Sequence, residues 1–271
     1  MEIGRPYSRL LYRLERFNSL SCEDRRCVAE LPLTVVNFSA RQPIYRHGDW
    51  PPRCTLVLSG FLYSNKMIGT SRRQITSLHV PGDVAGLQSL HLPHLDHSLY
   101  ALGPAVVAFF PHTALKYMLY RSSQLNQAFW RESFVEAAIL REWIANLGRR
   151  EALARVAHLV CELAARLQAA DLARDLCFSI PWTQTDVADA CGISAVHANR
   201  VVQELRRLGL VDWDSKQVKI REWEGLARIG DFSDDYLQLR TAGNSSSTPE
   251  RNASDTREIY DQLDALHGVE V

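Results

Sequence analysis

Three small residues at fixed spacing in the last third of the chain constrain the fold more than any other feature. Ala188 lies four residues before Gly192 and ten before Ala198, a spacing that lets two short helices cross closely. Gly192 can adopt the left-handed conformation that a tight turn between these helices needs. Thr183 can cap the first helix, and Ser194 can cap the second. The segment therefore predicts a helix-turn-helix.

The second helix of this motif, Ser194–Leu208, is expected to have one buried stripe and one exposed face. Side chains near the start of a helix that lies in the major groove of DNA can reach base edges. Arg200 can donate two hydrogen bonds to guanine, and either Asn199 or Gln203 can read adenine. Val196 can touch a thymine methyl group. The candidate base-reading residues are Val196, His197, Asn199, Arg200 and Gln203.

A β-hairpin is predicted directly after this helix. Leu210–Trp213 and Gln217–Ile220 are strand-like and are joined at Asp214-Ser215-Lys216, which would make the hairpin a wing. Hydroxyl groups near helix N-termini and a lysine at a hairpin tip suit contacts to DNA phosphates. The candidate phosphate-binding residues are Thr183, Thr185, Ser194 and Lys216. The module predicts a DNA-binding regulator, and the alternative is a small helical domain that binds protein.

The chain from Leu33 to about Pro111 has the pattern of short strands separated by turn residues. Strands at this spacing predict an antiparallel barrel or jelly roll. Two short helices are expected before it, within residues 8–31. The predicted strands are Thr34–Phe38, Thr55–Leu58, Phe61–Ser64, Ile75–Val80 and Ala105–Phe110.

A long helix is predicted over Ser122–Leu147, where apolar residues recur with helical period. It has more apolar surface than a lone exposed helix should show, so part of it is expected to face a partner. Gly148 would end this helix, and Arg149–Leu167 is predicted to form another. The residues expected on the partner-facing stripe are Leu125, Phe129, Leu140, Trp143 and Leu147, with Ile144 as the alternative to Trp143.

Composition and charge bear on what the protein can bind and in which cellular compartment it works. The 271 residues carry 31 Lys and Arg against 31 Asp and Glu, so attraction to nucleic acid must come from a local basic face. No run of about 18 apolar residues is present and no secretory signal is apparent, so we expect a cytoplasmic protein without a membrane span. The six scattered cysteines form no C-x-x-C pair, which fits free thiols in a reducing compartment.

The order of these parts, from about Leu10 to Asp231, resembles the Crp/Fnr family of bacterial transcription regulators. The resemblance is carried by HGDWPPRCTLVLSGFLYSNK, by VPGDVAGLQSL, by the long helix and most specifically by WTQTDVADACGISAVHANRVVQELRRLGLV. It implies a cyclic-nucleotide-binding-like β-roll, a dimer helix and a winged helix-turn-helix. It further implies a homodimer on a two-fold symmetric DNA site, with RNA polymerase as a partner if the protein is an activator.

The expected fold class is therefore α+β, in four parts. Residues 1–121 are expected to form a β-roll sensor domain with N-terminal helices, and residues 122–148 a dimerisation helix. Residues 149–232 are expected to form the winged helix-turn-helix. Residues 240–271 are rich in Ser, Asn, Thr and charge and are expected to form a disordered acidic tail.

The effector pocket that the resemblance implies departs here from the family pattern. Members that bind cyclic AMP have a Gly-Glu pair for the ribose and later an Arg-Ser or Arg-Thr pair for the phosphate. Here the pairs are Gly86-Leu87 and His97-Ser98. Leu cannot accept the ribose hydrogen bond and neutral His attracts a phosphate less than Arg, so no tight cyclic-nucleotide binding is expected. The candidate pocket residues are Gly82, Asp83, Gly86, Leu87, His97 and Ser98.

The cysteines are candidates for an iron–sulfur cluster and for a redox switch. Oxygen-sensing relatives hold an iron–sulfur cluster on closely spaced N-terminal cysteines plus one further cysteine. Cys22 and Cys27 lie in that region, but a third nearby cysteine is missing and Cys54 is a poor substitute, so no cluster is expected. Cys191 lies inside the helix-turn-helix, where related regulators can be switched by oxidation, but a small buried residue needs no such role.

His91, His94 and His97, beside Asp96, are the remaining candidates for a metal or haem site. Pro93 would break the helix that aligns them, so a histidine-rich surface loop is expected, without metal or haem. A metal-dependent enzyme on a cupin-like roll is the alternative function, but its ligands should lie on facing strands. The sequence also contains no P-loop and no defensible Ser–His–Asp order, so no enzymatic activity is expected.

Overall fold

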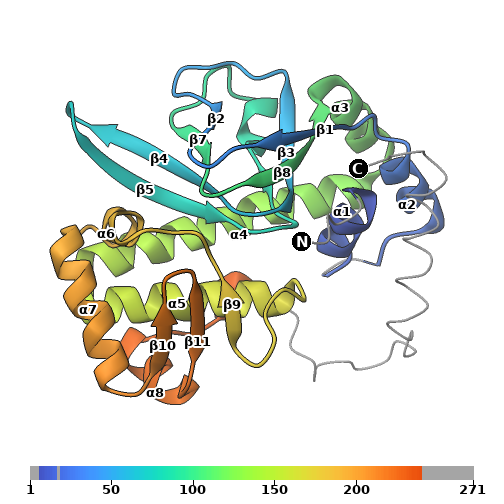
Figure 1. The fold of residues 1–271 in the computed structure, drawn as a ribbon. Coiled ribbons are helices and arrows are strands. Elements are labelled where there is room, and N and C mark those ends of the chain that lie inside the picture. Colours follow the sequence, from blue (N-terminus) through green and yellow to red (C-terminus); the bar gives the residue numbers. More distant parts are fainter. Residues whose placement is uncertain (1–5, 17–18, 240–271) are drawn as a thin grey trace.

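The computed structural model describes residues 6–16 and 19–239, and the predicted tail over residues 240–271 lies outside them. The chain forms a β-roll, a long helix that runs beneath the roll in the view of Figure 1, and a C-terminal helical module beside that helix. The predicted α+β architecture is confirmed.

The roll consists of two four-stranded antiparallel sheets, as the turn pattern predicted. In spatial order the first sheet contains β1 (Thr34–Phe38), β8 (Ala105–Pro111), β3 (Arg53–Ser59) and β6 (Val84–Ala85). The second contains β2 (Pro43–Tyr45), β7 (Ser98–Ala101), β4 (Leu62–Ile68) and β5 (Arg72–His79). Apolar side chains, among them Val57, Leu99 and Phe109, pack together inside the roll.

Strands β4 and β5 form a long hairpin that extends from the roll over the C-terminal module (Figure 1). Gly69, at φ +64°, allows the tight turn between them. The two strands run further toward this turn than the predicted segments Phe61–Ser64 and Ile75–Val80. The extra length pairs polar residues such as Lys66 and Gln74, which give no alternating apolar signal.

Short helices flank the roll. Leu10, Leu11 and Leu14 of the first helix are buried in an apolar cluster with residues of the roll and of the long helix. Leu87 and Leu90 complete the same cluster. These helices are α1 (Pro6–Glu15), α2 (Cys22–Ala29), the 3-10 turn η1 (Leu87–Leu90) and α3 (His112–Arg121).

The long helix α4 (Ser123–Arg149) has two apolar faces, and the partner-facing stripe predicted from the sequence was largely the wrong one. Leu125, Phe129 and Trp143 are buried within their own chain, and Leu147 is half-buried. Both faces recur with the same helical period, so periodicity alone could not distinguish them. The exposed apolar residues form a second stripe, the outer face of α4, which consists of Trp130, Phe134, Leu140 and Ile144.

The C-terminal module is built around α5 (Ala152–Ala169), whose second half is almost entirely buried. One apolar cluster joins Ile75 and Leu78 of β5 to Val160 of α5 and to Ala188 and Leu205 of the helix-turn-helix. The module therefore shares its core with the roll. Its other elements are β9 (Cys177–Ser179), α6 (Gln184–Cys191), α7 (Ala195–Arg207), β10 (Val211–Asp214), β11 (Gln217–Ile220) and α8 (Trp223–Gly230).

The described chain ends in a segment that packs back onto α4 and α5. This segment contains the 3-10 turn η2 (Asp235–Leu237). The Tyr236 hydroxyl donates to the buried Glu162 carboxylate at 2.9 Å, and Trp143 Nε1 donates to the same oxygen at 2.9 Å. The segment therefore ties the end of the module to the long helix through one carboxylate on α5.

Candidate nucleic-acid interface

The helix-turn-helix forms at the predicted residues. Thr183 and Asp186 make a capping box at the start of α6, in which the Asp186 carboxylate accepts the Thr183 N–H at 2.7 Å. Gly192, at φ +63°, ends α6 in the left-handed conformation. Ser194 Oγ then accepts the N–H of His197 at 3.2 Å and caps α7. Local chemistry thus fixes where both helices begin and where the first one ends.

Small side chains let α6 and α7 cross closely, as the spacing predicted. Ala188 and Ala198 are buried at this crossing. A Cβ atom at Gly192 would lie 3.0 Å from Leu147 Cδ2, so the turn also packs tightly against α4. The direction of α7 is therefore fixed relative to the long helix.

The face of α7 that points away from the core carries the candidate base-reading residues. Asn199 is half-buried, and its side-chain oxygen accepts a hydrogen bond from Gln184 Nε2 at 3.0 Å. Sequence analysis did not identify Gln184 as an interface residue, although the predicted Thr183 cap already placed it at the first position of α6. The other four candidates are exposed, namely Val196, His197, Arg200 and Gln203. Polar donors and acceptors at these positions are chemically suited to base edges.

The candidate phosphate-binding residues lie at helix N-termini and at the hairpin tip. Thr183, Thr185 and Ser194 are exposed at the starts of α6 and α7, where backbone N–H groups also point outward. The Thr183 hydroxyl is already used in the capping box, which leaves Thr185 as the freer hydroxyl. Lys216 is exposed between β10 and β11, beside Ser215 at φ +50°. The wing sheet has a third strand, β9, which was not predicted.

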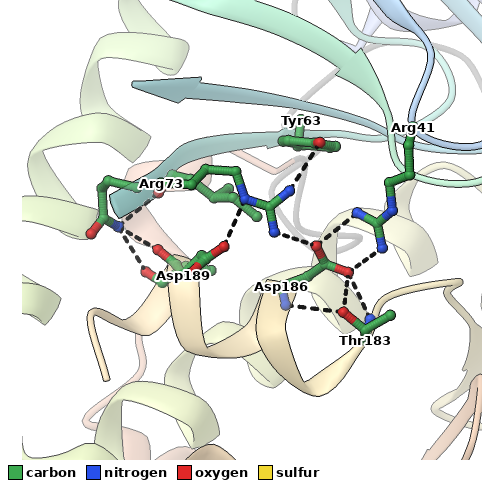
Figure 2. A network of polar contacts seen from close by, with 9 residues as sticks. Arg41, Tyr63, Arg73, Thr183, Asp186 and Asp189 are labelled. Atoms are coloured by element: carbon green, nitrogen blue, oxygen red, sulfur yellow. Dashed lines mark hydrogen bonds and ion pairs between the residues drawn. The ribbon is translucent and has the colours of Figure 1, made fainter. Parts of the chain in front are cut away.

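The opposite side of α6 is attached to the roll by ion pairs (Figure 2). Arg73 Nε lies 2.6 Å from Asp189 Oδ2, and a second nitrogen lies 2.7 Å from Asp186 Oδ1. Arg41 pairs with both oxygens of Asp186, one of them at 2.7 Å. Burial alone would raise the pKa of Asp186, but hydrogen bonds from Arg41 and Thr183 outweigh it and hold the pKa below its ordinary value. These partners lie far apart in sequence, and sequence analysis missed them.

Part of the candidate effector pocket is occupied by a buried ion-pair cluster. Asp83, in the turn after β5, pairs with Arg166 of α5 at 2.7 Å and with Arg13 of α1 at 3.2 Å. Burial tends to raise the pKa of Asp83, but the two arginines hold it below its ordinary value. Gly82, at φ +99°, allows the turn that places Asp83 there.

The other pocket candidates also contact their own chain. Leu87 is buried in the apolar cluster that contains α1, and Gly86 before it has φ +82°. His97 Nδ1 lies 2.8 Å from the neighbouring aspartate. Ser98 Oγ accepts the N–H of His47 at 2.9 Å. The position that would hold a ribose therefore presents the apolar side chain of Leu87. The position that would hold a cyclic phosphate presents His97 and Ser98, which already contact other groups of the chain.

Comparisons with known proteins match both halves of this arrangement. A cyclic nucleotide-binding domain model matches residues 35–122, and a Crp-like helix-turn-helix domain model matches residues 154–229. The anaerobic regulatory protein of Haemophilus influenzae is 25% identical over 69% of this chain and 73% of its own. The nitrogen fixation regulation protein FixK of Rhizobium meliloti is 25% identical over 73% and 88%. The chain belongs to the Crp/Fnr family of transcription regulators.

Solved structures support the same fold for this Crp/Fnr regulator. FixK2 from Bradyrhizobium japonicum has a TM-score of 0.68 at 24% identity and covers 73% of this chain and 98% of its own. A transcriptional regulator of the CRP/FNR family from Thermus thermophilus has a TM-score of 0.55 at 19% identity, covering 73% and 99%. The predicted arrangement of roll, long helix and helix-turn-helix is therefore that of known members.

The histidine-rich loop of this Crp/Fnr regulator contacts aromatic side chains. The His91 ring stacks on Trp130 of α4 with centroids 6.2 Å apart, and the His94 ring meets Trp50 at 6.1 Å. Among residues 6–16 and 19–239, no three His, Cys, Asp or Glu side chains form a group that could hold a metal ion. No helix in the same residues is long and apolar enough to cross a membrane.

The thiols of the regulator differ in exposure. Cys191 is buried within the helix-turn-helix, and burial raises the pKa of its thiol to about 12. A thiol with that pKa stays protonated at neutral pH and reacts slowly with oxidants. Cys22 and Cys27 both lie on α2, where Cys22 is exposed and Cys27 half-buried.

Acid is expected to weaken the fold through His79. This residue is buried on β5, its ring lies 2.9 Å from Ser64 Oγ, and burial lowers its pKa from 6.5 to about 4. Between pH 6.5 and pH 4, His79 therefore binds a proton in the unfolded chain but stays neutral in the folded chain. The stability contributed by neutral His79 is fully present above pH 6.5 and falls by about 2 kcal/mol at pH 5. Urea unfolding of the wild type and of His79→Gln at pH 7 and pH 5 tests this, and equal losses in both would contradict it.

Proposed function

We propose that this Crp/Fnr regulator binds a two-fold symmetric DNA site as a homodimer, with α7 of each subunit in a major groove. The observation that carries the proposal is the combination of two exposed faces in one packed structure. The face of α7 is polar and accessible, and the outer face of α4 is apolar and accessible. A dimer formed through the second face would present two copies of the first.

The outer face of α4 is the proposed dimer surface. Trp130, Phe134 and Ile144 have exposed fractions of 50%, 64% and 70%. Apolar residues that line up along an exposed helix are typical of protein–protein interfaces. Two copies related by a two-fold axis would bury the same stripe against itself, which is the usual geometry of a homodimer. A hollow beside Phe134 and Arg141 could receive side chains of the second copy.

We further propose that cyclic AMP does not control this regulator. Leu87 stands where an acceptor for the ribose would be needed, and His97 stands where a permanent cation would be needed. The buried carboxylate of Asp83 already has Arg166 and Arg13 beside it. Titration calorimetry with cyclic AMP is expected to show no binding in the micromolar range, and a micromolar Kd would contradict the proposal.

The proposed role is binding rather than catalysis, and it places the protein with DNA in the bacterial cytoplasm. RNA polymerase is the expected partner if the protein activates transcription. The second candidate function is a sensor whose C-terminal module binds protein. The exposed Arg200 and Gln203 and the half-buried Asn199 on α7 favour DNA, because these side chains suit base edges.

Binding to random and promoter-derived duplexes across a range of salt concentrations separates the two functions. A DNA regulator should lose affinity steeply with salt and should prefer one sequence by roughly 10³-fold or more. A protein-binding module should show neither property. The duplex selected in this way also supplies the operator for the experiments below.

Two substitutions test the roles assigned within the interface. Arg200→Ala is expected to lose about 1–3 kcal/mol of discrimination at one base position, because a bidentate contact to guanine is removed. Lys216→Ala is expected to weaken all sequences alike and to reduce the salt slope by about 1, because a phosphate contact is removed. Fluorescence anisotropy with the operator and its single-base variants measures both effects. Identical behaviour of the two variants would show that the role assignment is wrong.

A further inference from the structure

Two arginines of the β-roll form ion pairs with the first helix of the helix-turn-helix. These ion pairs have no part in the base contacts proposed above. Arg41 comes from the turn between β1 and β2, and Arg73 comes from β5 (Figure 2). Their partners, Asp186 and Asp189, lie one turn apart on α6. We call these four residues the ionic clamp.

The clamp is a built contact rather than a pair of surface charges. The Asp186 side chain is only 2% exposed, and those of Arg73 and Asp189 are 23% and 21% exposed. Arg73 is also held on the roll side, because it donates to the Tyr63 hydroxyl at 3.0 Å and lies over the Tyr63 ring at 5.2 Å. Its guanidinium is therefore held from the roll side as well as from α6.

Residues of the roll contact α6 near both of its ends. At the N-terminal end, Asp186 combines the capping of α6 with the ion pair to Arg41, whose backbone has the unusual φ of +65°. At the C-terminal end, Gln74 Nε2 donates to the Asp189 carbonyl at 2.7 Å, beside the ion pair from Arg73. Contacts at two ends restrain rotation of the helix as well as its distance from the roll.

Restraining α6 also restrains the recognition helix. The two helices cross at small buried residues around Gly192, and that turn packs against Leu147 at the end of α4. Arg155 NH1 also donates to the Cys191 carbonyl at 3.1 Å. Helix α7 therefore has a defined position relative to α4, along which the proposed dimer axis runs.

We propose that the ionic clamp positions the recognition helices and so sets the spacing between half-sites that the dimer accepts. This inference rests on the proposed function, a dimer on a two-fold symmetric site. In such a dimer the two recognition helices must match half-sites about one helical turn, or 34 Å, apart. One inserted base pair moves a half-site by about 3.4 Å and rotates it by roughly 35°, which a restrained helix-turn-helix cannot follow. Without the clamp, α6 and α7 keep their apolar contacts but lose the ionic restraint on their orientation, so they can turn further to follow it.

The test compares spacer preference with half-site affinity. The full-length wild type, Arg73→Gln and Asp189→Asn are measured on the selected operator, on versions with one base pair added or removed between the half-sites, and on a single half-site. Asp189 is chosen because its change leaves the Thr183–Asp186 cap intact. Arg72→Met is the matched control, since Arg72 is a neighbouring arginine at an exposed position of β5.

Both clamp variants are expected to keep the half-site affinity and the base preference of the wild type. Their discrimination against altered spacers is expected to fall by about tenfold, within the usual range of coupling between two parts of a protein. Arg72→Met is expected to retain wild-type discrimination. Unchanged spacer discrimination in both clamp variants would overturn the proposal, and so would an equal loss of affinity for every duplex. A wild type that binds the single half-site but never two half-sites together would instead overturn the proposed function.

Discussion

Replacing Phe134 and Ile144 together with aspartate is expected to convert the regulator into a monomer and to reduce its affinity for the two-fold symmetric operator by roughly 10²–10⁴-fold. Both side chains are exposed on the outer face of α4, at 64% and 70%. A two-fold axis would bring each new carboxylate close to its copy, so charge repulsion adds to the lost apolar contact. A monomer binds each half-site separately and loses the advantage of linked binding. Light scattering after size-exclusion chromatography and anisotropy on the operator measure the two effects.

The matched control is Tyr120→Asp, which places an acid at a 90% exposed aromatic position on α3, outside the stripe on α4. It is expected to remain a dimer with wild-type operator affinity. A Phe134→Asp/Ile144→Asp protein that stays dimeric would show that another surface forms the dimer. Affinity for a single half-site should be the same in all three proteins.

Arg166→Met is expected to lower the free energy of unfolding by about 3–5 kcal/mol, the usual penalty for breaking a buried ion pair. The Arg166 side chain is 6% exposed and lies 2.7 Å from Asp83 and 3.1 Å from Glu162. It also donates to the Leu78 carbonyl at 2.9 Å. Methionine fills a similar volume but leaves the buried Glu162 carboxylate without its cation and Asp83 with Arg13 alone. Urea unfolding at neutral pH measures the loss.

The pH dependence distinguishes this explanation from a simple packing defect. Arg166 lowers the pKa of Asp83 in the folded wild type, so its stabilising effect is present at neutral pH and is lost as acid protonates the carboxylate. The difference between wild type and Arg166→Met should therefore shrink as the pH falls. Adding Asp83→Asn and Glu162→Gln to Arg166→Met should recover part of the loss. Arg26→Met, at an exposed ion pair on α2, should change stability little.

The sequence predicted the DNA-binding module well because its determinants are local. The Thr183 cap, the left-handed Gly192 and the buried Ala188 act within one or two helical turns, and the structure confirms each of them. The roll was predicted from its turns, but β2, β6 and β7 were missed. Strands of two to four residues are too short to show an alternating pattern.

Contacts between distant segments could not be predicted in the same way. Arg41 and Asp186 are 145 residues apart, and nothing near either residue marks the other as its partner. The two apolar faces of α4 pose a related problem, since Phe129 and Phe134 both fit a helical stripe. Only the packing of α4 against the roll and α1 decides that Phe129 faces inward and Phe134 outward.

The apolar cluster shared by the roll and the C-terminal module has a consequence for protein engineering. Ile75 and Leu78 of β5 are buried against Val160 and its neighbours on α5, so a fragment cut near residue 149 would expose that surface to water. The roll and the C-terminal module should melt together in one cooperative transition, without an early step from the helix-turn-helix. Attaching this module to a different sensor would require a recipient that reproduces the covering face of β5. The DNA-binding module therefore cannot be exchanged between sensors as an independent domain.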